Sequence, residues 1–247
     1  IFGAQGNLYI NGDQDSGISN LNYTIGRREL DPVLLGKLKA RKVVFGNLNP
    51  PPIPLTKTPG FKTGLNISNK PLTLSSSYSN HTFEGYLKDN WEVELYKNNY
   101  LIDYQKESEH GKYSFKDIPL HYGINRFRLI FYGPRGQMRV ESKTFNIQRT
   151  LIPPEKFYYD FNIGIDQDHR YNSSIKFKKG LNNSTSIDLG YMKFHKDEGF
   201  KDYSYMNLNK SWLQSMFRTQ LVFDDQGSSA QKIKAQTKFK SGSIGIE

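Results

Sequence analysis

Two glutamates on one strand come closer than any other residues of this sequence to a catalytic spacing. Glu92 and Glu94 flank Val93, so on an extended strand their side chains share a face about 7 Å apart. Some glycoside hydrolases separate their two carboxyl groups by about this distance. Solvated strand faces carry such pairs routinely, and the sequence has no G-x-S-x-G motif, no glycine-lysine phosphate loop and no G-x-G-x-x-G motif. We therefore predict no catalytic residues and no enzymatic activity.

The metal-binding residue types form no metal-binding pattern. The sequence has no cysteine and five histidines, none of which has the i, i+4 spacing of a metal-binding helix. The run 166–169 (Asp-Gln-Asp-His) stands at a predicted strand end among turn residues. Asp13 and Asp15 lack the other ligands of a calcium loop. We expect no metal ion and no cofactor.

The formal net charge of +10 makes nucleic acid or an anionic membrane surface worth considering as a partner. The lysines, however, are spread over turns and alternate strand positions, which is typical of a solvated basic surface. The basic aromatic segment 125–132 could stack on bases, but Phe127, Leu129 and Phe131 share one face, as in a core strand. We expect no nucleic-acid partner.

The segment from His81 to Ile147 organises the chain. Apolar residues alternate with polar ones at 91–96 and 126–132, and a period of two predicts strands with one dry face. Turn residues separate these runs at Asn98-Asn99, at 109–111 and at 133–136. About six short strands in so few residues predict a small antiparallel β-sandwich of the immunoglobulin-like kind. We place this domain at 81–149, with a hinge-like approach at 75–77.

Both flanks show more polar strands at wider intervals. Before the sandwich we expect a hairpin with its turn at 11–13, a loop or helical turn at 30–38, a strand at 42–48, and a proline-rich connector at 50–54 that cannot join a ladder. After it, at 150–247, apolar residues oppose Asn, Gly and Lys in six segments that recur roughly every 12 to 15 residues. Such a pattern is typical of an outer-membrane meander. No apolar run approaches the roughly 20 residues of a membrane-spanning helix.

Several segments also match phrases of a known family. They are 43–47 followed by 60–72, then 82–87, 91–102 with Asn99 where glycine is usual, 115–118, and 143–147 followed by 158–161. In this order the chain resembles the outer-membrane ushers of chaperone-usher pilus systems. It departs from them at 122–127 and at Gly133-Pro134, as a divergent usher-like protein would.

The resemblance implies an all-β protein: part of a transmembrane antiparallel β-barrel at 1–80 and 150–247, with an inserted sandwich plug. It implies a plug-gated pore in the bacterial outer membrane that exports or assembles surface subunits, with lipid and periplasmic chaperone-subunit complexes as partners. Because a plug must meet the pore wall, we expect acidic plug residues to contact basic lumen residues. The candidates are Glu84, Glu92, Glu94, Lys176, Lys178, Lys234 and Lys238. The sequence starts without Met and stops in a predicted strand, so we expect a fragment.

Two other classes remain open from the sequence. One is a soluble or cell-surface adhesin or carbohydrate-binding protein of several β-sandwiches, which predicts that residues 150–247 fold without detergent. The other is a nutrient-receptor barrel with a carboxypeptidase-regulatory-like sandwich. In that class the sandwich precedes the whole barrel, so barrel-like strands before Thr82 argue against it.

Overall fold

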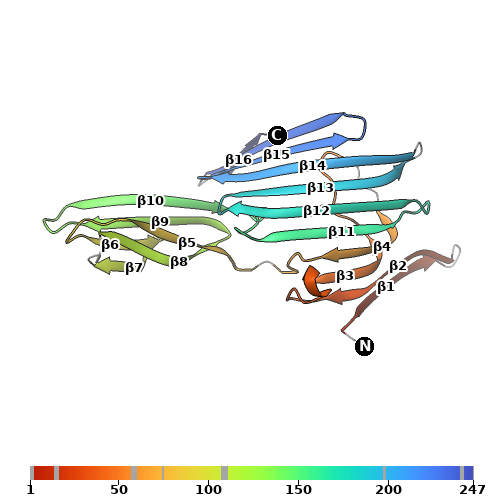
Figure 1. Ribbon diagram of the computed structural model, residues 1–247, viewed down its shortest axis with the longest axis horizontal. Helices are drawn as coiled ribbons and strands as arrows, with labels where there is room; N and C mark the ends of the chain where they lie inside the picture. Colours follow the sequence, from red (N-terminus) through yellow and green to blue (C-terminus); the bar gives the residue numbers. More distant parts are fainter. Residues whose placement is uncertain are drawn as a thin grey trace.

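The computed structural model describes residues 3–13, 17–56, 60–73, 75–106, 111–196, 199–239 and 242–246. Within them the protein is all-β, with one short 3-10 helix, η1 (Gly36–Leu38), as its only helical element. The strands form a large eleven-stranded sheet and two small sheets that belong to an inserted sandwich (Figure 1). No helix of the described residues is both long and apolar enough to cross a membrane.

The large sheet is an antiparallel meander in the order β1-β2-β3-β4-β11-β12-β13-β14-β15-β16-β17. Within it β4 pairs with β11, so the sandwich is inserted between two neighbouring strands of one sheet. In the described residues β1 and β17 each pair on one side alone, which makes this an open sheet and not a closed barrel. Its strands are β1 Gln5–Asp13, β2 Gly17–Arg28, β3 Lys42–Leu48, β4 Phe61–Ser68, β11 Phe157–Ile165, β12 Tyr171–Asn182, β13 Thr185–Lys196, β14 Gly199–Trp212, β15 Ser215–Asp224, β16 Ser229–Phe239 and β17 Gly242–Ile246.

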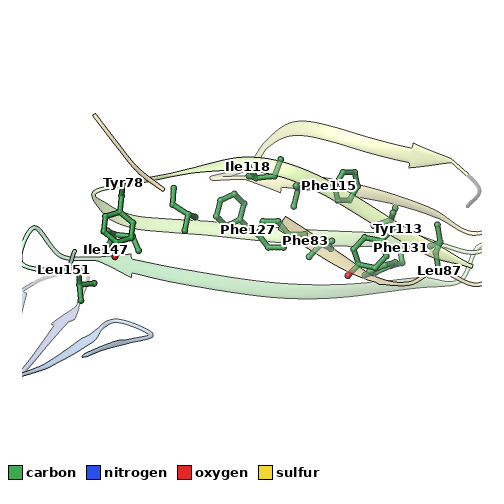
Figure 2. Close-up of a cluster of buried hydrophobic side chains, with 14 residues drawn as sticks. Tyr78, Phe83, Leu87, Tyr113, Phe115, Ile118, Phe127, Phe131, Ile147 and Leu151 are labelled. Carbon is green, nitrogen blue, oxygen red and sulfur yellow. The ribbon is translucent and has the colours of Figure 1, made fainter. Parts of the chain in front are cut away.

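The inserted sandwich packs a four-stranded sheet, β10-β9-β6-β7, against the pair β5-β8. Its strands are β5 Ser77–Tyr86, β6 Glu92–Lys97, β7 Tyr100–Lys106, β8 Lys112–His121, β9 Gly123–Tyr132 and β10 Met138–Ile147. Alternate residues of β6, β8 and β9 fill a continuous aromatic and aliphatic core, with Phe127 and Phe131 fully buried (Figure 2). At the end of this core nearest the large sheet, Tyr78, Ile147 and Leu151 close it (Figure 2).

The predicted turns have two different outcomes. Asn98 and Asn99 do connect β6 to β7, and both have positive φ (49° and 76°), a conformation that asparagine tolerates better than other residues with a side chain. This explains how asparagine can replace the usual glycine. The turn predicted at Asn11–Asp13 is wrong: these residues continue β1, and Asn11 pairs with Asn20 next to a bulge. The β1–β2 connection at 14–16, which includes Asp15, lies outside the described residues.

The large sheet is inverted relative to a water-soluble sheet. Along β14, Asn207, Asn209 and Ser211 are buried while Met206 and Leu208 between them are exposed. The same alternation recurs in β4, β11, β12 and β13, so the sheet has a buried polar face and an exposed apolar outer face. The polar face is defined by Asn66, Ser68, Asn162, Asn172, Ser174, Lys176, Ser186, Asp188, Asn207, Asn209 and Ser211. The outer face is defined by Ile163, Leu189, Tyr191, Met206, Leu208, Phe217, Phe223 and Ile233.

The apolar core of the sandwich does not continue into the large sheet. Trp91 and Phe127 pack within the sandwich, and Ile163 of β11 is 56% exposed on the outer face. Tyr159 is buried for a different reason: its hydroxyl donates to the carbonyl of Leu38 at 2.6 Å, so the loop that contains η1 folds over it. A single dry interior shared by the sandwich and the large sheet, which would have excluded a pore, is not what the described residues form.

Candidate functional site

The polar face is held together by side-chain hydrogen bonds that run from strand to strand. Asn66 of β4 donates to the side chain of Asn162 on β11 at 2.8 Å, and Asn162 donates to Ser174 on β12 at 3.2 Å. On the next pair of strands, Lys178 forms an ion pair with Asp188 at 3.0 Å. Buried polar groups are costly unless they are paired. This network therefore stabilises a hydrophilic surface without an apolar core behind it.

The connector between β3 and β4 lies across the polar face. The ammonium of Lys176, only 5% exposed, donates to the carbonyls of Pro51 and Pro52, the latter at 2.7 Å. Ile53, 2% exposed, packs in a small cluster with Met192, Tyr205 and Val222. The proline carbonyls are free to accept because no ladder uses them. The connector is thus fixed by one buried cation and one apolar side chain.

The reach of this connector shows that the polar face is concave. In a flat sheet β14 would lie five strand spacings, about 24 Å, from β3. From Leu48 at the end of β3 to Ile53 the chain can span at most about 17 Å, yet Ile53 packs beside Tyr205 of β14. The sheet therefore curves around the connector, as the twisted strands in Figure 1 also suggest.

The sandwich meets the large sheet through a few polar contacts at one end of the strands (Figure 1). Ser79 of β5 donates to the side chain of Asn183 in the β12–β13 turn at 2.8 Å. Ser211 of β14 donates to the carbonyl of Asn146 at the end of β10. His81 is within 3.5 Å of Asn183 and 3.1 Å of Lys143. These groups form a narrow joint rather than a packed apolar interface.

The chain that leaves the sandwich is pressed against β12 at Gly180. The amide of Gly180 donates to the carbonyl of Lys156 at 3.1 Å, and Pro154 forms a parallel bridge to Gly180. A Cβ at Gly180 would lie 2.0 Å from the carbonyl oxygen of Pro153. Glycine is therefore required for this close approach of two backbones.

The acidic and basic residues proposed to meet between plug and lumen have other partners in the structure. Glu92 pairs with Lys106 at 3.5 Å, and Glu94 accepts from Tyr96 and Tyr132. Lys178 pairs with Asp188 and Lys176 binds the connector, while Glu84 is exposed and Lys234 faces a cleft beside the sandwich. The side chain of Lys238 lies outside the described residues. For Glu92, Glu94, Lys176 and Lys178 the described residues thus give partners other than the expected ones, in an arrangement where the sandwich lies beyond the strand ends, and the plug-to-lumen contacts stay a prediction.

Sequence reasoning missed the residues that join the parts of the molecule: Asn146, Asn183, Ser211 and the connector carbonyls. Alternation identifies a face, but it does not show which distant segment lies on that face. The one signal that could have pointed to them is the recurrence of Asn and Ser opposite apolar residues in β4, β11, β12 and β14. In the described residues no group of three or more His, Cys, Asp or Glu could hold a metal ion.

Comparison with known proteins gives a structural likeness at low sequence identity. No protein-family model and no curated protein matches this sequence. Among solved structures, the E. coli P pilus tip assembly intermediate PapC-PapD-PapK-PapG, in its second conformation, matches with a TM-score of 0.50 at 11% identity, over 94% of this chain and 29% of that chain. The P pilus usher (PapC) translocation pore gives 0.41 at 11% identity, covering 98% of this chain and 51% of that chain. A crystal structure of the same pore gives 0.32 at 10% identity, covering 98% and 57%.

The first of these matches supports a shared usher-like fold and nothing finer. The chain spans about a third to rather more than half of the length of these neighbours.

Proposed function

We propose that this chain forms part of the wall of an usher-type outer-membrane pore that exports surface protein subunits, with the sandwich as its plug. The observation that carries the proposal is the inverted large sheet, whose concave face is polar and whose outer face is apolar. In water an exposed apolar face of this extent would promote aggregation. In a bilayer the same face meets hydrocarbon, and the polar face lines an aqueous space.

Strand lengths support a membrane-spanning role. A β-strand crosses a bilayer with about 9–11 residues when tilted by about 45°, and β12 to β16 have 10 to 14 residues. On β14 the outer face is apolar between Asp202 and Lys210, apart from Ser204. Eight residues at this tilt correspond to roughly 20 Å, close to the apolar band of outer-membrane proteins.

Turn lengths support an orientation. At the end of the sheet that carries the sandwich, two residues connect β12 to β13 and two connect β14 to β15. At the other end five residues connect β11 to β12 (166–170) and four connect β15 to β16 (225–228), whereas the 29–41 connection at the sandwich end and the two-residue β13–β14 connection at the other end do not follow this trend. Outer-membrane barrels have short periplasmic turns and longer outer loops. The sandwich is then on the periplasmic side, where chaperone-subunit complexes would arrive.

Movement of the sandwich is part of the proposal. The sandwich is joined to the sheet by the segments 69–76 and 148–156 and by the polar joint at Ser79 and Ser211. Each neutral hydrogen bond contributes only about 1 kcal/mol, so the position beyond the strand ends and a position inside the curve can differ little in free energy. We infer a plug that leaves the pore by swinging to its periplasmic rim.

Planar-bilayer conductance of the full-length protein tests this function. We expect small, flickering conductance for the intact protein and a larger, steady conductance after deletion of residues 82–148. Substitution of Ser79 by alanine, which weakens the rim position without removing the sandwich, should shift the intact protein toward its low-conductance state. If the intact and the deleted protein show equal small conductance, the sandwich is not a plug. If neither conducts, the chain is not part of a pore.

A further inference from the structure

A cleft of about 980 Å³ lies between the base of the sandwich and the inner surface of β15 to β17. Its charged lining residues are all basic. The sandwich contributes Asn146 and Arg149, the sheet contributes Arg218 and Lys234, and no Asp or Glu of the described residues lines the cleft. Arg149, Arg218 and Lys234 have no role in the plug mechanism proposed above, and that mechanism uses only the main-chain carbonyl of Asn146. A cleft that offers donors and cations selects a ligand that carries acceptors and negative charge.

Asn146 supplies an unused donor. The residue is only 4% exposed, and its side-chain oxygen accepts from Gln148 at 3.1 Å, which assigns the other atom as the amide nitrogen. That nitrogen, Nδ2, is buried and has no hydrogen-bond partner in the structure. An unsatisfied buried donor is destabilising. Because this nitrogen is buried beneath the cleft surface, an acceptor in the cleft reaches it only after a shift of the Asn146 side chain.

The cations are held in place from the sheet side. Arg218 donates from Nε to the buried side chain of Asn209 at 2.8 Å, which orients its guanidinium. Its cross-strand neighbour is Lys234. Like charges directly opposite each other in a sheet destabilise it, and an anion between them would remove that cost. A guanidinium oriented in this way is suited to bidentate recognition of a carboxylate.

We infer that this cleft binds an acidic polypeptide segment. The volume is far larger than one small anion needs and lies at the upper end of the range for drug-sized ligands, which leaves room for a few residues of an extended segment. Apolar side chains, among them Ile124, Met216 and Ile246, share the walls with the cations, which fits a segment that mixes carboxylates with apolar residues. Because the ligand would contact the sandwich and the sheet together, it favours the arrangement seen here over any other position of the sandwich. The binding itself requires no conducting pore.

Binding of a fluorescent hexapeptide of alternating glutamate and leucine to the full-length protein in detergent micelles tests the inference. The matched probe has glutamine in place of each glutamate. We expect Lys234→Gln and Arg149→Gln each to weaken binding of the acidic peptide about 10-fold, the loss typical of one charge-assisted hydrogen bond. Lys210→Gln is the control, since Lys210 is exposed on the outer face of the same sheet and does not line the cleft. Thermal unfolding of each variant establishes that it folds, and exposed Arg149 provides a variant with little structural risk.

Selective binding of the acidic peptide, lost in the two cleft variants and kept in the control, supports the inference. Equal binding of the glutamine peptide would show an apolar groove, and an equal effect of Lys210→Gln would show a diffuse basic surface; either overturns it. Absence of binding also overturns it, as does displacement of the peptide by micromolar inorganic phosphate, which would identify a free-anion site. A protein that conducts but does not bind the peptide retains the proposed function and loses this inference.

Discussion

Substitution of Met206 by arginine distinguishes a lipid-facing sheet from a water-facing one. Met206 lies near the middle of β14 on the outer face and is 38% exposed. If this face meets water, arginine at such a position changes the free energy of unfolding by no more than about 0.5 kcal/mol. If it meets hydrocarbon near the bilayer midplane, the same change costs about 2–4 kcal/mol.

Leu213→Arg serves as a control that places the same charge outside the apolar band. Leu213 lies in the two-residue turn after β14 and is exposed. Seven residues of strand tilted by about 40° place it roughly 18 Å from the level of Met206, outside the apolar band. Leu213→Arg should therefore cost less than about 1 kcal/mol, although it introduces the same charge just beyond the end of the same strand.

The assay is urea unfolding of the full-length protein in lipid vesicles, followed by tryptophan fluorescence. We expect Met206→Arg to lower the free energy of unfolding by about 2–4 kcal/mol and Leu213→Arg to leave it within about 1 kcal/mol of the parent. Equal, small effects of both substitutions would refute the assignment of the outer face to lipid. Equal, large effects would mean that the cost has no dependence on depth, and would refute it as well.

Three further predictions follow from the connector and the joint. Lys176→Met removes the ammonium that donates to the carbonyls of Pro51 and Pro52. We expect the free energy of unfolding to fall by about 2–3 kcal/mol and protease cleavage at 49–60 to increase. An unchanged cleavage pattern would contradict this. Gly180→Val places a side chain where a Cβ already meets a carbonyl oxygen at 2.0 Å, so crosslinking of the sandwich to the β12–β13 turn should fall several-fold, and unaltered crosslinking would show that the exit segment moves freely. Burial and the nearby Lys143 lower the pKa of His81, so the unfolded chain binds a proton more readily than the folded one and stability should rise with pH up to about 6.5. A His81→Asn variant should lack this rise when unfolding is measured between pH 5 and 8.

The sandwich could be predicted from the sequence because its signals are local. Trp91 to Tyr96 and Arg126 to Tyr132 alternate cleanly, and Gly133-Pro134 and Asn98-Asn99 provide the turns, so strands and connections follow from residues close together in the chain. The turn at Asn11–Asp13 was wrong for the converse reason. An Asn-Gly pair favours a tight turn locally, but pairing of Asn11 with Asn20 extends the hairpin past it.

The positions of the candidate site residues could not be predicted in the same way. Glu92 and Lys176 lie on strands, as predicted. Glu92 pairs with Lys106, and Lys176 donates to the carbonyls of Pro51 and Pro52, which are more than a hundred residues away from it in the sequence. Opposite charges on two domains suggest a contact only if the domains face each other. In the structure the sandwich extends beyond the strand ends (Figure 1), so the plug-to-lumen contacts remain a prediction.

The amino-acid sequence by itself determined most strand positions, though not Asn11–Asp13, and that the large sheet has one polar and one apolar face, because side chains of a strand alternate whatever surrounds it. The tertiary structure alone decided that the polar face is concave, that the proline connector lies on it, and that the sandwich stands at its rim above a basic cleft. These features depend on contacts between segments that are distant in the chain. The curvature of the sheet brings those segments together, and no local sequence pattern encodes it.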